Sequence, residues 1–572
     1  MRKIMNAADA FVDESLEGIM LAHPQSYRAA SEDGRAVVRV DAGTGHRVGI
    51  VTGGGSGHLP LFLGYVGHGL ASGVGVGNVF SSPSAKQLYA ATMASNEGRG
   101  VLYLYGNYGG DVYNFDLAAT LAAQDGVETA TVVGTDDVLS APMERAADRR
   151  GVAGLFFVMK IAGAKAQEGA DLETVREIAE RANGVCRTMG VGLAPTILPA
   201  AGEPTFTLND GEMEVGIGIH GEPGHHRGPL EPADEIAQRF LTEIVPELEL
   251  SQGSRVAVLV NGMGATPLEE LYILYRKVHL TLLGMGVEIV WKFVGELVTS
   301  LEMVGASLSV IVLDDEMQGL LDAPAHSPFF SQGVVPQATR SASDKISVES
   351  TDFSEGEARE VRRAAKESNL RAWMLNVVAQ MPRHSDELRN LDAAVGDGDL
   401  GVTIALGSKA ILQALQELPS DAHPVELIKV AGSEFAAANP STFAALVGGG
   451  LVTASSTFED EEQHSTIQFA QAIGVLQQSI MDRGKAQVGD KTVVDILDAA
   501  RRALLESTDS ESSVQTMERV QRYALEALES SRGLSAKLGR AGWLGDRTKG
   551  HLDPGSVAFL RLLEEVQAAL KE

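Results

Sequence analysis

This sequence has a single cysteine and no long apolar segment. The single cysteine, Cys186, excludes a disulfide within the chain. No uncharged apolar run reaches the roughly 18 to 20 residues that a membrane-spanning helix needs. The N-terminal stretch MRKIMNAADAFVDESLEG carries acidic residues where a signal peptide would have its apolar segment. We therefore expect no membrane association and a reducing, cytoplasmic location.

The sequence also has few basic residues relative to acidic ones. Lysine and arginine number 47 against 76 acidic residues, so the formal net charge is −29. Such a chain repels the phosphates of nucleic acids, which disfavours a nucleic-acid partner. Hydrophobic residues make up 44% and charged residues 22%, as in soluble globular proteins. A length of 572 residues is too long for one ordinary core, so two or more domains are expected.

The first half, from about residue 46 to 313, is built from short apolar runs that each end in glycine or a polar turn. These runs are RVGIVTGGGSG, GVLYLYGNYGG, ATVVGTDD, GLFFVMKIAGA, RVAVLVNGMG, VEIVWKFVG and SLSVIVLDD. Runs that are apolar on both faces are typical of parallel strands covered by helices. The pattern predicts an α/β domain over residues 1–332, with ligands bound beyond the carboxyl ends of its strands.

The second half follows a different pattern. Residues 333–355 lose apolar periodicity and are rich in serine, threonine and aspartate, which is typical of a solvated linker. Beyond it the apolar residues recur with a helical period, which predicts an all-α bundle over residues 356–572. The stripes are formed by Leu370, Trp373, Met374, Val377 and Val378, by Ile411, Leu412 and Leu415, and by Ile496, Leu497, Ala500 and Leu504.

Three places in the first half combine glycine with reactive side chains. GGGSGH holds Gly53, Gly54, Gly55, Ser56, Gly57 and His58, NYGGD ends in Asp111, and GIGIHGEPG contains His220. Glycine lets a ligand lie against backbone amides, and imidazole and carboxylate transfer protons near neutral pH. A lone histidine or aspartate in a glycine turn is often only a cap or turn residue. Three such places at successive strand ends favour a small-molecule site, which no Walker, dinucleotide or nucleophile-elbow motif explains.

The second half carries a tight group of carboxylates in LDAAVGDGDLG, namely Asp392, Asp397 and Asp399. On a continuous helix they would point to different faces, but Gly396 and Gly398 interrupt it and let them converge. Converging carboxylates are typical of Mg²⁺ ligands, and an acidic turn between helices is the alternative. The segments GKAQVGDKTVVDIL and GRAGWLGDRTKGHLDPG are polar and interrupted by glycine. Loops of this kind could cover a nucleotide at one end of the bundle.

These motifs, in this order, resemble those of fused, ATP-dependent dihydroxyacetone kinases over nearly the whole chain. The first half has GGGSGH, GNVFSSPSA, NYGGDVYNF and GIHGEPG, and the second has GDGD, GDKTVVDIL and LGDRTKGHLDPG. The resemblance implies an α/β ketose-binding domain, a helical barrel or bundle that binds ATP and Mg²⁺, and a homodimer.

The resemblance also implies roles for individual residues. His220 would attack the ketone of the sugar to form a covalent hemiaminal, with His58 and Asp111 assisting at the reacting hydroxyl and residues 53–57 holding the sugar. Asp392, Asp397 and Asp399 would hold Mg²⁺. The implied nucleotide site consists of Gly401, Val402, Thr403, Ser441, Thr442, Gly484, Arg540, Asp553, Pro554 and Gly555. A neutral imidazole nitrogen adds to a carbonyl but not to an alcohol, so this anchor would select short ketoses over glycerol.

The sequence departs from the family pattern in places. Gly106 stands where many members have lysine. The smaller residue predicts room for a four-carbon ketose such as erythrulose, with dihydroxyacetone as the other possible substrate. Leu400 follows GDGD, and NPSTFAALVGGG replaces the expected glycine-serine loop, with Ser441 and Thr442 as its substitutes. Two alternatives stay open, a kinase that takes phosphate from a phosphocarrier protein and a ketose-sensing regulatory protein. The fused domains and the retained carboxylates favour the ATP-dependent kinase.

Overall fold

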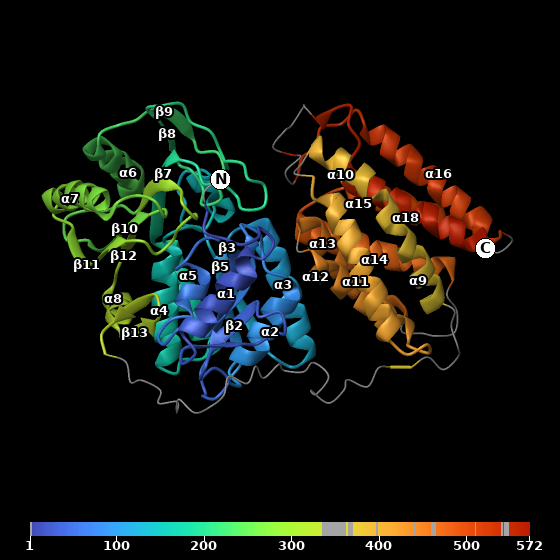
Figure 1. The fold of residues 1–572 in the computed structure, drawn as a ribbon, viewed down its shortest axis with the longest axis horizontal. Coiled ribbons are helices and arrows are strands. Elements are labelled where there is room, and N and C mark those ends of the chain that lie inside the picture. Colours follow the sequence, from blue (N-terminus) through green and yellow to red (C-terminus); the bar gives the residue numbers. More distant parts are fainter. Residues whose placement is uncertain are drawn as a thin grey trace. The chain divides into compact units, whose positions relative to one another are not determined.

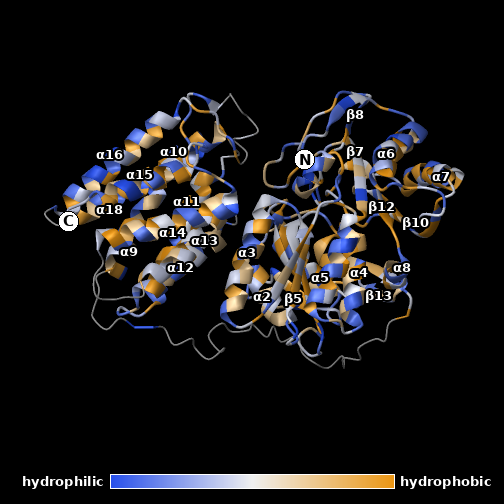
Figure 2. Cartoon of the chain, turned by 180° about the vertical axis from the view of Figure 1, so that it is seen from behind, coloured by the Kyte–Doolittle hydropathy of each residue, from blue (hydrophilic) through white to orange (hydrophobic). Residues whose placement is uncertain are grey.

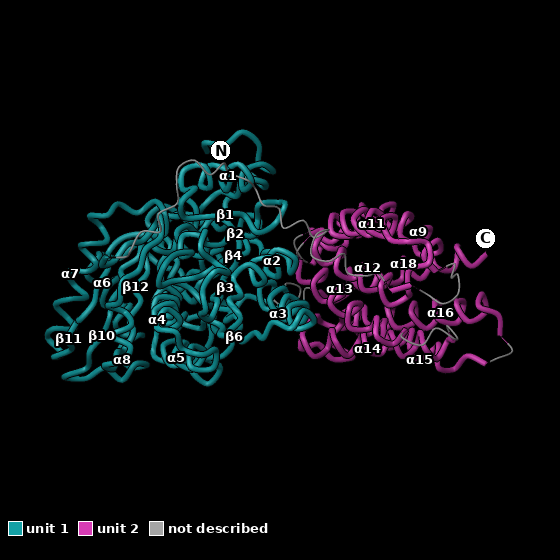
Figure 3. The backbone as a smooth tube through the Cα atoms, turned by 90° about the horizontal axis from the view of Figure 1, so that it is seen from below, with its two compact units in different colours: residues 1–353 teal, residues 354–572 magenta. Residues whose placement is uncertain are grey.

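The structure is a computed structural model, and its two compact units, residues 1–353 and 354–572, are distinguished in Figure 3. It describes residues 3–334, 362–363, 370–395, 398–439, 441–458, 465–508, 511–538, 542 and 548–571. Nearly all of the predicted linker, residues 333–355, lies outside these residues, and so do Asp397 and Arg540.

The first unit combines sheets and helices, which confirms the predicted α/β class (Figure 1). Its strands are β1 (Tyr27–Ala29), β2 (Ala36–Arg39), β3 (Gly49–Ser56), β4 (Gly73–Val79), β5 (Val101–Gly106), β6 (Thr129–Gly134), β7 (Cys186–Ala194), β8 (Glu212–Val215), β9 (His226–Pro229), β10 (Arg255–Gly262), β11 (Glu288–Gly295), β12 (Val304–Val312), β13 (Ala325–Ser327) and β14 (Phe330–Gln332). Its α-helices are α1 (Phe11–Ala22), α2 (Ala85–Ser95), α3 (Gly109–Gln124), α4 (Leu155–Gln167), α5 (Leu172–Gly184), α6 (Ala233–Glu247), α7 (Leu268–Gly284) and α8 (Asp315–Asp322).

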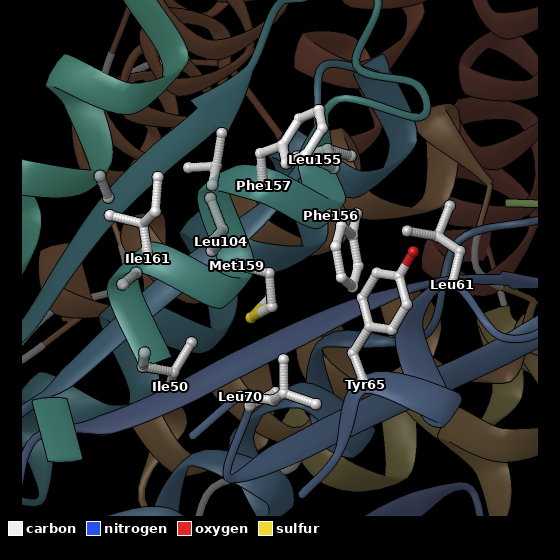
Figure 4. Packing of buried hydrophobic residues seen from close by; sticks show 14 of the residues in the cluster. Ile50, Leu61, Tyr65, Leu70, Leu104, Leu155, Phe156, Phe157, Met159 and Ile161 are labelled. Carbon is white, nitrogen blue, oxygen red and sulfur yellow. The ribbon is translucent and has the colours of Figure 1, made fainter. Parts of the chain in front are cut away.

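The first sheet has the strand order β1-β2-β4-β3-β5-β6, and its four strands from β4 to β6 are parallel. Both of its faces are buried. On β5, Leu102 and Leu104 belong to the core on the α4 side, where Figure 4 shows Leu104 near Phe157 and Ile161. Tyr103 and Tyr105 belong to the opposite core, on the side of α2 and α3. Because side chains alternate along a strand and both faces are covered, the run VLYLYG is apolar throughout.

The second sheet differs from the prediction of parallel strands. Its order is β11-β10-β12-β7-β8-β9, and only β10 and β11 pair in parallel. Helices α6 and α7 cover one face of this sheet. Its strands β7, β10 and β12 are as apolar as those of the first sheet because they too are buried on both faces, so their composition carries no signal of direction.

The run GLFFVMKIAGA is helix α4, so the prediction of a strand there was wrong. Eleven of its residues, Leu155 to Ala164 and Ala166, are buried. The helix shares one core with Leu102 of the first sheet and Leu259 of the second. A helix that is enclosed on all sides has no polar face, and a short apolar run of this kind does not distinguish a helix from a buried strand.

The second unit is helical in its described part, as predicted. Its α-helices are α9 (Leu370–Gln380), α10 (Ser385–Ala393), α11 (Leu400–Glu417), α12 (Pro424–Ala438), α13 (Thr442–Ala454), α14 (Thr466–Gly484), α15 (Val493–Leu505), α16 (Ser513–Ser531) and α18 (Pro554–Lys571). The three predicted apolar stripes lie on α9, α11 and α15 and contribute to one core. Figure 2 shows hydrophilic and hydrophobic residues alternating along these helices.

Successive helices from α11 to α16 pack on one another through short connections, which makes neighbours antiparallel. The N-termini of every second helix therefore gather at one end of the bundle. No helix in the described ranges is long and apolar enough to cross a membrane.

Candidate active site

The carboxyl ends of the parallel strands in the first sheet carry the reactive residues. His58 follows β3, Phe80 and Ser82 follow β4, and Tyr108 and Asp111 follow β5. Because β4, β3 and β5 are adjacent and parallel, these loops meet at one edge of the sheet.

The glycines of residues 53–57 make room for the chain itself. A Cβ on Gly54 would clash with the Phe62 ring, and one on Gly55 would lie 2.6 Å from the backbone nitrogen of Ser81. Gly57 has a φ of +100°, which other residues rarely adopt. The run therefore lets the turn after β4 approach β3 closely, which brings Phe80 against His58. That a ligand lies on these backbone amides stays a prediction.

His58 is held as a neutral, buried imidazole. Its Nδ1 lies 2.8 Å from the carbonyl oxygen of Thr299, and its ring stacks on Phe80 at 4.8 Å between centroids. Since a carbonyl only accepts, Nδ1 carries the proton and Nε2 has the lone pair. Burial, with the neighbouring His220 as a second cause, lowers the pKa of His58 to about 3. The Nε2 atom can therefore accept a hydrogen bond from a hydroxyl group near neutral pH.

His220 stands in the loop between β8 and β9, and its ring meets the residues of the first sheet. The ring centroid lies 4.8 Å from that of His58, 4.7 Å from that of Tyr108 and 5.3 Å from that of Phe80. Its Nδ1 lies 2.7 Å from Oε1 of Glu222. A carboxylate at Nδ1 leaves Nε2 as the nitrogen that can contact a ligand. The two predicted histidines are thus brought together from different sheets.

Asp111 lies in the first turn of α3 and is 8% exposed. Burial raises the pKa of its carboxyl to about 7, against the opposing effects of a hydrogen bond with Ser82 and of His220. A carboxyl with a pKa near neutrality suits a general base, because it is partly deprotonated yet basic enough to take a proton. Ser82 stands two residues from Phe80, so one turn contacts both Asp111 and His58.

Three buried polar atoms at this edge of the sheet have no hydrogen-bond partner, namely His58 Nε2, Tyr108 Oη and Asp111 Oδ1. Buried polar atoms in proteins are nearly always paired, and each exception needs an explanation. Two acceptors and a hydroxyl gathered near His220 suit a small ligand that carries several hydroxyl groups.

The sequence reasoning missed Glu222, Phe80 and Tyr108 as site residues, although each lies inside a quoted motif. Tyr108 also bears on Gly106. A Cβ at position 106 would lie 3.0 Å from the Gly151 carbonyl oxygen and 3.0 Å from the Tyr108 ring. The space beside Gly106 is therefore already filled, and Gly106 does not by itself widen the site.

In the second unit, two of the three predicted metal ligands can be described. Asp392 lies near the end of α10 and Asp399 at the start of α11, with Gly398 between them at a φ of +77°. Burial, and then the like charge of Asp392, raise the pKa of Asp399 to about 6. A divalent cation would relieve this repulsion, so the residues fit Mg²⁺. Asp397, the third predicted ligand, lies outside the described residues.

The predicted nucleotide residues lie at helix N-termini that are brought together. Thr403 stands in the first turn of α11 and Ser441 caps α13, with their hydroxyls 3.5 Å apart. Asn439 Nδ2 donates to Thr403 Oγ1 at 2.7 Å. A Cβ on Gly555, in the first turn of α18, would lie 2.9 Å from the Phe443 ring of α13. Three helix N-termini therefore lie close together, and the dipoles and amides of helix N-termini favour phosphate groups.

Asp553 and Gly484, which are also predicted to border the nucleotide, lie at the same end of the bundle. Asp553 is buried, which raises its pKa to about 6, and its Oδ2 accepts from Ser556 N at 2.7 Å to cap α18. Gly484 ends α14, and a Cβ there would lie 3.3 Å from Leu446 of α13. The predicted set also includes Val402, Thr442, Pro554 and Arg540, of which Arg540 lies outside the described residues.

Comparison with known proteins gives two family matches, the Dak1 domain over residues 17–329 and the DAK2 domain over residues 394–568. L-erythrulose 1-kinase of Mycolicibacterium smegmatis is 36% identical, with 99% of both chains covered. L-erythrulose kinase of Pectobacterium atrosepticum is 35% identical over 100% of this chain and 97% of that protein. D-erythrulose kinase of Mycolicibacterium smegmatis is 35% identical over 98% and 97%.

Among solved structures, the dihydroxyacetone kinase of C. freundii in complex with AMP-PNP and Mg²⁺ has 26% sequence identity and a TM-score of 0.53. The match covers 99% of both chains. Both halves of the present chain, in the same order, thus have counterparts in one kinase chain.

Proposed function

Because the chain belongs to the dihydroxyacetone kinase family, we propose that it transfers the γ-phosphoryl group of ATP to a terminal hydroxyl of a short ketose held as a hemiaminal on His220. Full-length relatives named as kinases and the related kinase structure with AMP-PNP and Mg²⁺ support an ATP- and Mg²⁺-dependent phosphotransferase that acts on an alcohol group of a ketose.

The observation that carries the covalent step is the commitment of His220 Nδ1 to Glu222. It leaves the lone pair of Nε2 free to attack the carbonyl carbon of the ketose. The Nε2–C bond forms as the C=O π bond breaks, its electron pair passes to oxygen, and a proton from solvent completes the hydroxyl. The imidazole ring, which keeps its Nδ1 proton against the Glu222 carboxylate, is then a cation. Glycerol has no carbonyl group and cannot form this bond.

Asp111 and His58 support the second half of the reaction. The Asp111 carboxylate would take the proton of the terminal hydroxyl as the hydroxyl oxygen attacks the γ-phosphorus and the bond to the leaving ADP breaks, since the pKa of Asp111 is raised to about 7. His58, neutral and with Nε2 unpartnered, would accept a hydrogen bond from the same sugar and orient it. Tyr108, whose hydroxyl is also unpartnered, would contact another of its hydroxyl groups.

Asp392 and Asp399, with Asp397, would hold Mg²⁺, which when bound neutralises charge on the ATP phosphates. The N-terminal turns of α11, α13 and α18 would bind those phosphates through backbone amides. The residues of the second unit would thus hold the metal ion and the nucleotide, whereas the proton transfers would take place in the first unit.

We expect Asp399→Asn to lower turnover by about 10²-fold or more, because charge neutralisation at the phosphates is a main source of rate in phosphoryl transfer. Binding of the ketose to the first unit should stay unchanged. Both quantities can be followed, by ADP release and by the signal of a ¹³C-labelled ketose. The control is Asp386→Asn, at an exposed carboxylate of α10 that pairs with Arg389. Equal turnover in both variants would show that Asp399 is not a metal ligand.

Erythrulose is the substrate we propose alongside dihydroxyacetone, supported by full-length relatives named as kinases of L- and D-erythrulose. Purified protein with Mg-ATP should release ADP with erythrulose and dihydroxyacetone but not with glycerol. One erythrulose enantiomer well ahead of dihydroxyacetone would establish a tetrulose kinase. No ADP release with any ketose would contradict the proposal and favour a phosphocarrier protein as phosphate donor or a regulatory role.

Three further expectations are part of the proposal. The domain limits 1–332 and 356–572, joined by 333–355, are supported by the compact units and by the two family matches. A cytoplasmic location is supported by the single, buried Cys186. A homodimer is supported by the family resemblance alone.

A further inference from the structure

We propose that Glu222 is the positioning residue of His220, fixing the tautomer that attacks the carbonyl and balancing the positive charge that the ring gains, and that Arg150 keeps Glu222 in place. This inference rests on the proposed hemiaminal and deepens it, because it assigns a role to residues that do not touch the ketose.

The first support is the geometry of the turn that contains both residues. Glu222 Oε1 accepts from His220 Nδ1 at 2.7 Å, and Oε2 accepts from the backbone nitrogen of His220 at 3.0 Å. The turn is closed by two backbone bonds, from Gly221 N to the Gly218 oxygen and from Gly218 N to the Glu222 oxygen. One carboxylate thus holds both the ring and the backbone of His220, so the imidazole is fixed in direction and in tautomer.

Gly218 shows that the chain makes space for this arrangement. A Cβ at position 218 would clash with Glu222 Oε2 and would lie 2.5 Å from Arg150 Nη1. Any larger residue would push the carboxylate or the guanidinium out of place. The second glycine of GIGIHGEPG is therefore explained by packing against the pair formed by Glu222 and Arg150.

Arg150 approaches Glu222 from the segment after β6. Its Nη1 lies 3.9 Å from Glu222 Oε2, its Nε donates to Asp137 Oδ2 at 2.9 Å, and its Nη2 donates to the Gly216 oxygen at 3.0 Å. Burial alone would raise the pKa of Glu222, but His220, and then Arg150, outweigh it and hold this pKa at about 2. Glu222 is a carboxylate whenever the enzyme works.

The chemistry explains why a carboxylate is useful here. When Nε2 bonds to the carbonyl carbon while Nδ1 keeps its proton, the ring becomes a cation. An ionised carboxylate at Nδ1 stabilises that cation, as a buried aspartate does for a catalytic imidazolium. His58 adds no opposing charge from the other side, because the low pKa of His58 keeps it neutral. Glu222 therefore favours the adduct over the free ketone.

The test measures adduct formation and the protonation of the ring separately. Wild-type enzyme, Glu222→Gln and Glu222→Ala are mixed with dihydroxyacetone labelled with ¹³C at the carbonyl, and the tetrahedral adduct carbon is quantified by NMR. The ring nitrogens are observed with ¹⁵N-histidine. Glu214→Gln is the matched control, since Glu214 is a buried carboxylate of the same hairpin that accepts from Gly224 and Arg227 rather than from His220.

We expect Glu222→Gln to keep the Nδ1–H tautomer, because the amide oxygen still accepts. The variant should lose the charge balance and, with it, about 10- to 100-fold of adduct stability. Glu222→Ala should also lose the fixed tautomer. Glu214→Gln should match the wild type in both. Wild-type levels of adduct and unchanged nitrogen signals in both Glu222 variants would overturn this role alone. No adduct in the wild type would instead overturn the covalent anchor itself.

Discussion

The His220→Ala variant is expected to lose ketose turnover by about 10³-fold or more, because covalent anchoring is worth a large share of the effective concentration that holds reactants in place. The loss has a specific signature. The tetrahedral ¹³C signal of the bound ketose should vanish, since alanine has no nitrogen to add to the carbonyl. ATP binding should remain, because the predicted nucleotide residues belong to the second unit. Measurement of ADP release and nucleotide affinity on the same preparation separates these effects.

The chain offers a matched control in the same hairpin. His225 is exposed and stands five positions beyond His220. His225→Ala should retain turnover and adduct. A His220→Ala variant that still phosphorylated erythrulose within about tenfold of the wild type would contradict the covalent anchor and leave His220 as a contact residue.

The Asp111→Asn variant is expected to lose about 10²- to 10⁴-fold in kcat, the range typical of a general base. In the wild type, kcat/KM should rise with pH through about 7, because the base must be ionised and the pKa of Asp111 is raised to about 7. The variant should lose this rise. The pH profile of ADP release checks both statements, with Asp125→Asn, at the exposed end of α3, as the control.

Stability provides a second readout for Asp111. Its pKa in the folded protein, about 7, lies above the ordinary value of 3.8. The folded state therefore binds this proton more tightly, so the contribution of Asp111 to stability is greatest at low pH and is lost as pH rises from about 4 to 7. Asparagine removes the cost of a buried charge. Asp111→Asn should thus have a higher melting temperature than the wild type at pH 8, and a lower one would point to a structural role.

The sequence allowed much of the first unit to be predicted because strand ends carry local signals. His58 and Asp111 each follow an apolar run and a glycine turn, and adjacent parallel strands bring such positions together. His220 comes from the second sheet, whose strand directions could not be predicted. Its contact with His58, at 4.8 Å between ring centroids, depends on packing between segments 162 residues apart, as the numbering 58 and 220 shows.

The missed features have physical reasons as well. Glu222 lies two residues after His220 in a glycine turn, where no period indicates which way a side chain points. Helix α4 is enclosed on all sides, so its sequence lacks the polar face by which a helix is predicted. Gly106 was expected to enlarge the site, but Tyr108, two residues away, covers it. A smaller residue does not open a site when a neighbouring ring occupies the space.

In the second unit, the periodicity of α9, α11 and α15 was enough to predict helices. The proximity of Thr403 on α11 and Ser441 on α13 follows from the alternating direction of α11, α12 and α13, which short connections impose. The exact contacts between the helix ends, such as that from Asn439 to Thr403, depend on side-chain geometry that periodicity does not contain.

The most direct test of the account is ¹³C NMR of dihydroxyacetone, labelled at its carbonyl carbon, with wild-type enzyme and with His220→Ala. A covalent anchor on His220 predicts a protein-bound tetrahedral carbon signal in the wild type that is absent from the variant and from the free ketose. A bound ketose whose carbonyl signal stays unchanged in the wild type, or an adduct that persists without His220, would contradict it.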